Sequence, residues 1–326
     1  MDRELALEMV RVTEAAAILA GRWMGRGDKI AADQAAVDAM RRMLDTVAIA
    51  GTVVIGEGEM DEAPMLYIGE RVGSGQGDPV DVAVDPLEGT NLVAQGRPGA
   101  IAVMALAPSG HLLHAPDMYM DKLVAGPAGR GVLDLDAPIG ENVAALAKAQ
   151  DRPVEDITVV VLDRPRHAEL IAGVRKVGAR IQLISDGDVS PAVAACLPGA
   201  GVDLLAGIGG APEGVLAAAA VRCLGGSMVA RLYPEEAAEV DRARSMGIDP
   251  VDRLLTLDDL VRGNDALFVA TGITDGEILK GVRYGADAVT THSVVMRSLT
   301  GTVRFVEAEH RLERKAQYGK RAAADR

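Results

Sequence analysis

The sequence predicts a mixed α/β (α+β) protein of two domains, each with its own sheet. In the first domain, two helical segments precede several short strands, which predicts helices packed on a mainly antiparallel sheet. From residue 153 onward, strands alternate with helices, which is typical of an α/β domain with a mixed, largely parallel sheet. The 326 residues, of which 49% are hydrophobic, are enough for two such cores.

Two helices are expected at the start of the chain. Apolar residues recur at steps of three and four from Leu5 to Trp23, which is the spacing of one helix face. Gly25 and Gly27 end this helix, and Asp28 is placed to cap the next one. The inward stripe of the second helix is expected at Ile30, Val37, Met40 and Leu44.

Asp33 lies on the same stripe as Ile30, three residues later. One interpretation is a carboxylate at the edge of the stripe, or one paired with Lys29 four residues earlier. The alternative is an inward-facing carboxylate, whose burial without a partner would cost several kcal/mol. A metal ion shared with acidic residues farther along the chain would supply that partner.

Two acidic turns follow short valine-rich strands, about thirty residues apart. The strand 52–55 leads into Gly56-Glu57-Gly58-Glu59-Met60-Asp61-Glu62, and the strand 80–84 leads into Asp85-Pro86-Leu87-Glu88-Gly89-Thr90. Carboxylates gathered at strand ends repel one another, and divalent cations that take carboxylate oxygens would offset this repulsion. In the first turn, Glu57 and Asp61 are the stronger candidates, while Glu59 and Glu62 are interpreted as loop charges.

The second acidic turn has the features of a two-metal phosphate site. Pro86 stiffens the turn and Gly89 opens it, so Asp85 and Glu88 can each bind one of two adjacent cations. Thr90 then offers a hydroxyl and a backbone N–H to a phosphate. Two-metal sites hold the attacking and leaving oxygens of an in-line displacement. The alternative is an ordinary surface turn.

The rest of the chain divides at residues 150–153. Further strands are predicted at 101–106 and 112–124 before this point, and at 157–162, 181–184, 202–208, 228–232 and 267–271 after it. Helices are predicted at 166–177, 189–197, 214–224 and 235–246, and a terminal hairpin at Thr300-Gly301. The predicted domains are therefore 1–152 and 153–314, and residues 315–326 are predicted to be a frayed tail.

Polar residues follow three successive strands of the second domain, where α/β proteins bind ligands. Arg164, Pro165 and Arg166 follow the first strand, Asp186, Gly187 and Asp188 the second, and Gly209, Gly210 and Glu213 the third. Arginines suit a phosphate, and aspartates suit sugar hydroxyls. Alternatively, the arginines are solvated loop charges, the acids are helix caps and the glycine pair is a plain turn.

Composition argues against several classes of protein. A net charge of −13 and an aromatic content of 2% disfavour nucleic-acid binding. The first residues include Asp2, Glu4 and Glu8 and lack a basic flank with an apolar run, so no signal peptide is expected. No apolar run reaches the roughly 20 residues that a membrane helix needs, and the expected location is the cytoplasm. Cys196 and Cys223 are expected to be buried small hydrophobic residues without a disulfide.

These motifs resemble those of known phosphatases. The segment 85–90 is similar to the Asp-Pro-(Ile/Leu)-(Asp/Glu)-Gly-(Thr/Ser) motif of the lithium-sensitive, metal-dependent sugar and inositol phosphatases. The segment 56–70 (GEGEMDEAPMLYIGE), together with 115–120, 185–188 and 207–214, resembles the class II fructose-1,6-bisphosphatases of the GlpX type. The similarity runs from about residue 3 to about residue 314 and implies a two-domain, layered sugar-phosphatase fold.

The resemblance implies hydrolysis of the 1-phosphate of fructose 1,6-bisphosphate, a step of gluconeogenesis, with two or more Mg²⁺ or Mn²⁺ ions. The implied metal ligands are Asp33, Glu57, Asp85, Glu88 and Glu213. Asp61 and Thr90 would position and activate the attacking water. The implied substrate contacts are Lys29, Glu88, Gly89, Thr90, Tyr119, Arg164, Pro165, Arg166, Asp186, Gly187, Asp188 and Gly210.

Other functions on the same scaffold stay open from the sequence. Some relatives also hydrolyse sedoheptulose 1,7-bisphosphate. An inositol monophosphatase-like enzyme, or another sugar or nucleotide phosphatase, would need fewer cationic contacts than the two-arginine loop offers. A non-catalytic sugar-phosphate sensor would be expected to have lost some of the carboxylates. Neither nucleic acid nor a membrane is expected as a partner, and a homodimer or homotetramer is expected.

Overall fold

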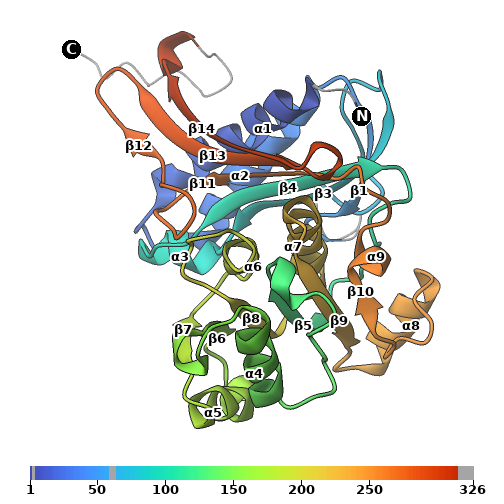
Figure 1. Ribbon diagram of the computed structural model, residues 1–326. Helices are drawn as coiled ribbons and strands as arrows, with labels where there is room; N and C mark the ends of the chain where they lie inside the picture. The colour runs from blue at the N-terminus through green and yellow to red at the C-terminus, as the bar shows by residue number, and fades with distance from the viewer. Residues whose placement is uncertain (2–3, 59–63, 315–326) are drawn as a thin grey trace.

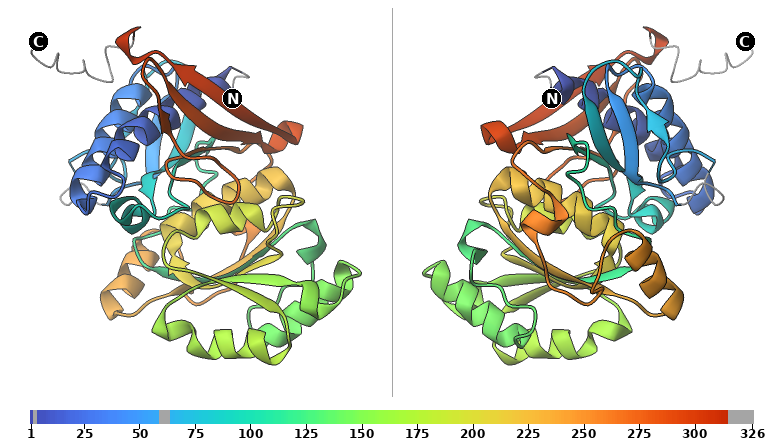
Figure 2. Two further views of the ribbon diagram at one scale, coloured as in Figure 1. Left: turned by 90° about the vertical axis from the view of Figure 1, so that its left-hand side faces the viewer. Right: turned by 90° about the vertical axis from the view of Figure 1, so that its right-hand side faces the viewer.

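The computed structural model describes residue 1 and residues 4–58 and 64–314. Two sheets lie one above the other, with helices between them and on both outer faces (Figure 1). Helices α1 (Leu5–Ala20) and α2 (Lys29–Leu44) cover the first sheet, and α4 (Ile139–Ala149) and α5 (Ala168–Lys176) cover the second. Helices α6 (Val189–Ala194) and α7 (Ala211–Leu224) lie between the sheets, as Figure 2 shows from two sides. The predicted mixed α/β class is confirmed.

The first sheet has eight strands in the order β12-β13-β11-β4-β3-β1-β2, with β14 paired to β13. The strands are β1 (Ala50–Ile55), β2 (Arg71–Val72), β3 (Pro79–Glu88), β4 (Ile101–Pro108), β11 (Leu267–Gly272), β12 (Arg283–Tyr284), β13 (Val289–Arg297) and β14 (Thr302–His310). Among the described strands, β1 and β3 run parallel and the other neighbours run antiparallel, so the sheet is mainly antiparallel, as predicted. The hairpin of β13 and β14 turns at the predicted place.

The second sheet is mixed, but it is less parallel than predicted. Its six strands, in spatial order, are β10 (Leu255–Thr256), β9 (Ser227–Tyr233), β5 (Tyr119–Ala125), β8 (Leu204–Gly210), β6 (Thr158–Leu162) and β7 (Arg180–Ile184). Strand β6 is parallel to β7 and β8, whereas β5 is antiparallel to both β8 and β9. Strand β5 comes from the N-terminal half and separates β8 from β9, which the β-α alternation alone could not reveal. The strand predicted at 112–124 begins only at Tyr119, after Pro116, which has no N–H for a sheet.

The two sheets do not divide the chain at residue 152. Strand β5 precedes this boundary but lies in the second sheet, and β11 to β14 follow it but complete the first sheet. Local patterns of helix and strand do not determine which distant strand becomes a neighbour. The division into domains 1–152 and 153–314 stays a prediction, and the predicted tail 315–326 lies outside the described residues. Two small helices, α8 (Ala237–Ser245) and α9 (Leu257–Leu260), flank β10.

Helix α7 is the central element and packs against strands of both sheets. Its residues are apolar on nearly all sides, which is typical of a helix buried between two layers. Small residues allow the close approach: a Cβ at Gly214 would lie 2.5 Å from Met120 Sδ. Cys223 on α7 and Cys196 after α6 are buried free thiols, as predicted. In the described part of the chain, α7 included, no helix has the length and hydropathy needed to cross a membrane.

Helix α2 begins as predicted. Asp28 Oδ1 accepts a hydrogen bond from the N–H of Ala31 at 3.0 Å. The buried residues of its stripe include Val37, Met40 and Leu44. Ile30, which was predicted to belong to this stripe, is instead 76% exposed. Ile30 lies in the first turn of α2, before Ala32, the first buried residue of the helix. The prediction was wrong because the spacing of apolar residues does not show where a helix extends beyond the element against which it packs.

Candidate active site

A cavity of about 460 Å³ opens where the two sheets meet. Its walls come from the ends of β1 and β3 in the first sheet, from the ends of β6, β7 and β8 in the second, and from the residues that begin α6 and α7. Most predicted site residues line it: Asp33, Glu57, Asp85, Glu88, Gly89, Thr90, Tyr119, Arg164, Arg166, Asp186, Gly187, Asp188, Gly210 and Glu213. Lys29 and Pro165 are exposed and are not among the described residues that line it, and Asp61 lies outside the described residues.

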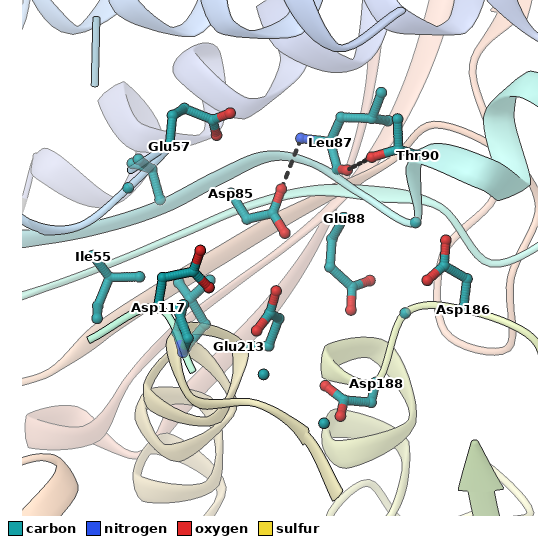
Figure 3. A pocket seen from close by; sticks show the side chains of 18 of the residues that line it. Ile55, Glu57, Asp85, Leu87, Glu88, Thr90, Asp117, Asp186, Asp188 and Glu213 are labelled. Atoms are coloured by element: carbon teal, nitrogen blue, oxygen red, sulfur yellow. Dashed lines mark hydrogen bonds between the residues drawn. The ribbon is translucent and has the colours of Figure 1, made fainter. Parts of the chain in front are cut away.

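The second acidic turn belongs to strand β3 rather than to a loop beyond it. Strand β3 continues to Glu88, but its pairing with β4 shifts register between Asp85 and Glu88. Such an irregularity accommodates Pro86, which has no N–H to donate, and re-aims the neighbouring side chains. Asp85 Oδ1 accepts a hydrogen bond from the N–H of Leu87 at 3.0 Å (Figure 3). The strand therefore carries both carboxylates to the cavity.

Gly89 and Thr90 connect this strand end to helix α3 (Thr90–Gln95). Gly89 has a φ of 88°, a left-handed conformation that favours glycine. The Thr90 hydroxyl donates to the carbonyl of Leu87 at 3.2 Å, which fixes its side chain at the edge of the cavity. The two residues thus occupy a well-defined turn beside Glu88.

Glu57 and Asp33, together with Asp85 and Glu88 of β3, form the acidic wall of the cavity. The N–H of Glu57 donates to the carbonyl of Leu66 at 3.0 Å, and a Cβ at Gly56 would lie 1.9 Å from the same oxygen, so glycine is required before Glu57. Asp33 reaches the cavity from α2, and burial, with no contribution from Lys29, raises its pKa. The structure therefore favours the inward-facing interpretation of Asp33.

Glu213 lies in the first turn of α7, directly after the glycine pair that ends β8. A Cβ at Gly210 would lie 1.7 Å from Glu213 Oε2, and a Cβ at Gly209 would lie 2.0 Å from Asp188 Oδ2. The glycines are therefore more than a plain turn, because they let two carboxylates lie against the backbone of β8.

The loop after β7 faces the acidic strand end. The N–H and Nδ2 of Asn91 donate to Asp186 Oδ2 at 3.3 and 3.0 Å, which ties this loop to the start of α3. Gly187 has a φ of 71°, and a Cβ there would lie 2.8 Å from Glu88 Oε2. Glu88 is thus packed tightly against the loop.

Asp188 does not cap helix α6, contrary to the simpler interpretation of this residue. Its side chain makes no capping hydrogen bond. The N–H of Val189 instead donates to Glu88 Oε1 at 3.0 Å, across the gap between the two sheets. Glu88 has taken the capping position, and the carboxylate of Asp188 is left for another partner.

Burial and mutual repulsion raise the pKa values of the acids. Burial, followed by the charges of Asp33 and Glu213, raises the pKa of Glu57 to about 8. Burial also raises the pKa of Glu88 to about 8. Burial and then the neighbouring carboxylates raise the pKa of Asp85 well above its ordinary value, and the pKa values of Asp33 and Glu213 are raised chiefly by burial. Lys122 acts in the opposite direction on the pKa of Glu213, but burial outweighs it.

The donor set fits divalent cations. Three buried carboxylate oxygens have no hydrogen-bond partner within the described residues: Glu88 Oε2, Asp188 Oδ1 and Glu213 Oε2. Unpartnered buried carboxylates are unfavourable, and divalent cations such as Mg²⁺ accept such oxygens as ligands. The carboxylates of Asp85, Glu88 and Glu213 face one another across the cavity (Figure 3). No three Asp, Glu, His or Cys side chains of the described ranges already form a closed ligand cluster, so cation binding would draw these carboxylates together.

Two arginines at the end of β6 form the basic wall. The guanidinium of Arg166 lies over the ring of Tyr119, 4.4 Å from its centre, and its Nη2 donates to the carbonyl of Ile208 at 2.9 Å. Arg164 lies 3.9 Å from Asp186, its partner across the mouth of the cavity. Arg166 is therefore a held side chain rather than a freely solvated loop charge. A guanidinium fixed in this way is suited to bind a phosphate.

His167, which the sequence analysis missed, supports the arginine loop. The N–H of Ile208 donates to His167 Nε2 at 2.8 Å, and Nδ1 lies 2.7 Å from the carbonyl of Leu162. The tautomer with a proton on Nδ1 satisfies both contacts, so neutral His167 connects the ends of β6 and β8. Burial lowers its pKa, which favours this neutral form. A single histidine after a polar loop gives no sequence signal for such a role.

Three further residues at the site were missed. Asn91 and Asp117 line the cavity. Asn91 directly follows the segment 85–90 and Asp117 lies within the segment 115–120, so their places in the sequence could have indicated them. Lys122 is buried in β5 and lies 2.8 Å from Asp188. An alternating strand ordinarily turns a lysine to solvent, so the sequence pattern did not single it out.

One cavity thus combines carboxylates that suit divalent cations with arginines that suit a phosphate, at the junction of two sheets. These features define the class of metal-dependent phosphatases that act on sugar phosphates. Residues 3–310 match the family of bacterial fructose-1,6-bisphosphatases that are glpX-encoded. The chain belongs to this family, which is metal-dependent, and the resemblance seen in its motifs is confirmed.

Individual relatives agree with the family. The protein named fructose-1,6-bisphosphatase 1 class 2 of Escherichia coli (strain K12) is 46% identical over 328 residues, with 97% of each chain covered. Proteins named fructose-1,6-bisphosphatase class 2 from Escherichia coli O6:H1 and from Shigella flexneri have the same identity, 46%, and the same coverage, 97%. The range matched by the family, residues 3–310, spans both sheets and the segments that line the cavity.

Proposed function

We propose that this protein hydrolyses the 1-phosphate of fructose 1,6-bisphosphate, which yields fructose 6-phosphate and phosphate. The observation that carries the proposal is the cavity in which the acidic wall of the first sheet faces the arginine loop of the second. A sugar with two phosphates needs positive charge at two places. Cations bound to the acids would serve one phosphate, and the arginines would serve the other.

Asp33, Glu57, Asp85, Glu88 and Glu213 would hold two or more Mg²⁺ or Mn²⁺ ions. Such ions supply charge neutralisation at the phosphate and lower the pKa of a bound water. The unpartnered oxygens of Glu88 and Glu213 support this assignment, because both are buried beside the cavity.

The other residues of the cavity would bind and orient the substrate. Gly89 and Thr90 would offer N–H groups at the start of α3 to the 1-phosphate, and Thr90 together with Asp61 would orient the attacking water. Arg164 and Arg166 would bind the phosphate that is retained, with Tyr119 holding the Arg166 side chain. Asp186 and Asp188 would accept hydrogen bonds from sugar hydroxyls, since carboxylates are acceptors and repel phosphate.

A phosphate-release assay tests this proposal. The purified protein is supplied with Mg²⁺ or Mn²⁺ and, separately, with fructose 1,6-bisphosphate, sedoheptulose 1,7-bisphosphate or inositol 1-phosphate. We expect phosphate and fructose 6-phosphate from the first substrate, and we propose the sedoheptulose compound, one carbon longer, as a second substrate. Faster release from inositol phosphate would reassign the substrate, and tight binding of fructose 1,6-bisphosphate without turnover would indicate a sensor.

Substitutions of two acids test the assigned roles. Asp61→Ala and Glu88→Ala should each lower kcat by orders of magnitude, because each removes a group proposed to act on the reacting phosphate or its cations. Glu141→Ala changes an exposed acid of α4 and should leave kcat unchanged. Near wild-type kcat in both site variants would contradict the mechanism. A cytoplasmic location and a homodimer or homotetramer stay predictions.

A further inference from the structure

A lysine is buried in the second sheet beside the cavity. Lys122 lies on β5 between Met120 and Val124, on the strand face that packs toward α7, and only 1% of its surface is exposed. Its Nζ lies 2.8 Å from Asp188 Oδ2 and donates to the carbonyl of Gly210 at 3.0 Å. Removing an ammonium group from water is unfavourable, and a buried ion pair is often no more stabilising than apolar side chains of the same size. Stability alone therefore does not account for Lys122.

Strand β8 is shaped to admit this ion pair. Gly207 is the residue opposite Lys122 in the register of β5 and β8. A Cβ at Gly209 would lie 2.0 Å from Asp188 Oδ2 and 3.1 Å from Lys122 Nζ. Because Gly209 has no side chain, Lys122 can extend past it and contact Asp188.

Asp188 uses one oxygen for Lys122, and its other oxygen is buried beside the cavity. Asp188 Oδ1 is buried and, among the described residues, has no hydrogen-bond partner. Asp188 lines the cavity, and its carboxylate is directed into it (Figure 3). A carboxylate accepts hydrogen bonds from hydroxyls and repels phosphate, so the free oxygen suits a sugar hydroxyl.

We propose that Lys122 is a positioning residue for substrate recognition, holding Asp188 so that its second carboxylate oxygen binds a hydroxyl of the sugar. The inference rests on the proposed function for the nature of that sugar. Lys122 contacts the carbonyl of Gly210 and is not among the described residues that line the cavity. Without it, Asp188 would face the nearby Glu88 and Glu213 with no positive charge beside it, and its carboxylate would turn away from them.

The variant Lys122→Met tests the proposal, because it removes the charge and keeps an unbranched side chain. The Kd values of fructose 6-phosphate and of inorganic phosphate are measured by titration calorimetry with Mg²⁺ present. We expect the Kd of fructose 6-phosphate to rise about ten-fold, the effect of one lost charge-assisted hydrogen bond, while that of inorganic phosphate changes less than about two-fold. Equal changes in both Kd values, or no change in either, would overturn the proposal.

A second comparison avoids leaving Asp188 buried and unpaired. Fructose 6-phosphate binding is compared between Asp188→Asn and the double variant Lys122→Met/Asp188→Asn. If Lys122 acts through Asp188, the two Kd values agree within about two-fold, and a further ten-fold loss in the double variant would mean that it acts elsewhere. As a control, Arg297→Met breaks a mostly buried pair with Asp265 outside the cavity and should lower the Tm while leaving both Kd values unchanged.

The wild-type protein separates this inference from the proposed function. No turnover of fructose 1,6-bisphosphate by the wild type would overturn the function and leave the binding comparison intact. Turnover by the wild type, with unchanged fructose 6-phosphate affinity in Lys122→Met, would overturn the role of Lys122 alone. Failure of the wild type to bind fructose 6-phosphate would overturn both.

Discussion

Divalent-cation affinity should fall steeply when the pH is lowered from 8 to 7. The pKa of Glu57 and that of Glu88 are each raised to about 8, with burial as the first cause in both. A cation binds the ionised carboxylates, so at lower pH it must displace protons from them. The ionised fraction of each group is roughly one half at pH 8 and one eleventh at pH 7, so two independent groups lower the affinity roughly thirty-fold, or about 2 kcal/mol. The raised pKa of Asp85 acts in the same direction and makes the dependence steeper.

Titration calorimetry with Mg²⁺ measures this effect directly. Metal-free protein is titrated at pH 7, 8 and 9, each in two phosphate-free buffers that differ in ionisation enthalpy, so that the number of released protons is obtained. We expect about two protons released per protein at pH 7 and fewer than one at pH 9 from these two groups. Glu88→Gln removes one titrating group and should reduce the dependence between pH 8 and 7 to roughly five-fold. Affinity that is constant within two-fold between pH 7 and 8, with no proton release, would refute the reasoning.

Three further predictions concern stability and substrate binding. In metal-free protein the free energy of unfolding should fall as the pH rises between about 4.5 and 8, because ionisation of Glu57 and Glu88 is unfavourable only in the folded state. Differential scanning calorimetry in EDTA checks this, and a higher Tm at pH 8 than at pH 6 would contradict it. Gly187→Ala should lower the free energy of unfolding by about 1 kcal/mol, because φ is 71° there, and should raise KM by displacing Glu88. The control Gly131→Ala, at a φ of 69° with open space around it, should lower the free energy of unfolding by a similar amount and leave KM unchanged. His167→Leu leaves the buried N–H of Ile208 unpaired, so it should lower the free energy of unfolding by about 1 to 3 kcal/mol and raise KM by displacing the arginine loop. The same change at exposed His114 should have neither effect. Chemical unfolding and steady-state kinetics measure the two quantities.

The sequence located the acidic wall because local chemistry marks it. Valine-rich runs predict the strands, and Pro86 with Gly89 predicts an interruption at the end of one of them. Acids at such positions stand out, so Asp85, Glu88 and Glu57 could be selected without knowing how the strands are arranged. The structure places all three at the cavity.

Long-range pairing could not be predicted in the same way. The strand 267–271 is evident from its apolar residues, yet nothing local indicates that it pairs with β4 rather than with a strand of the second sheet. The parallel character of the second sheet was overestimated because β5 was assigned to the other half of the chain. Lys122 escaped notice because its importance depends on Asp188, which is 66 positions away in the sequence (122 to 188) and adjacent only in space.

The construction of the first sheet from both ends of the chain has a consequence for biosynthesis. Strand β4 is buried along nearly its whole length, and its neighbour β11 is made more than 150 positions later (108 to 267). A nascent chain that has not yet reached β11 exposes an apolar strand edge, which is a template for aggregation. The second sheet can be completed first, since its strands lie between residues 119 and 256. The first sheet is therefore completed only when residues 267–326, about the last fifth of the polypeptide, are being made and β11 closes the open edge of β4.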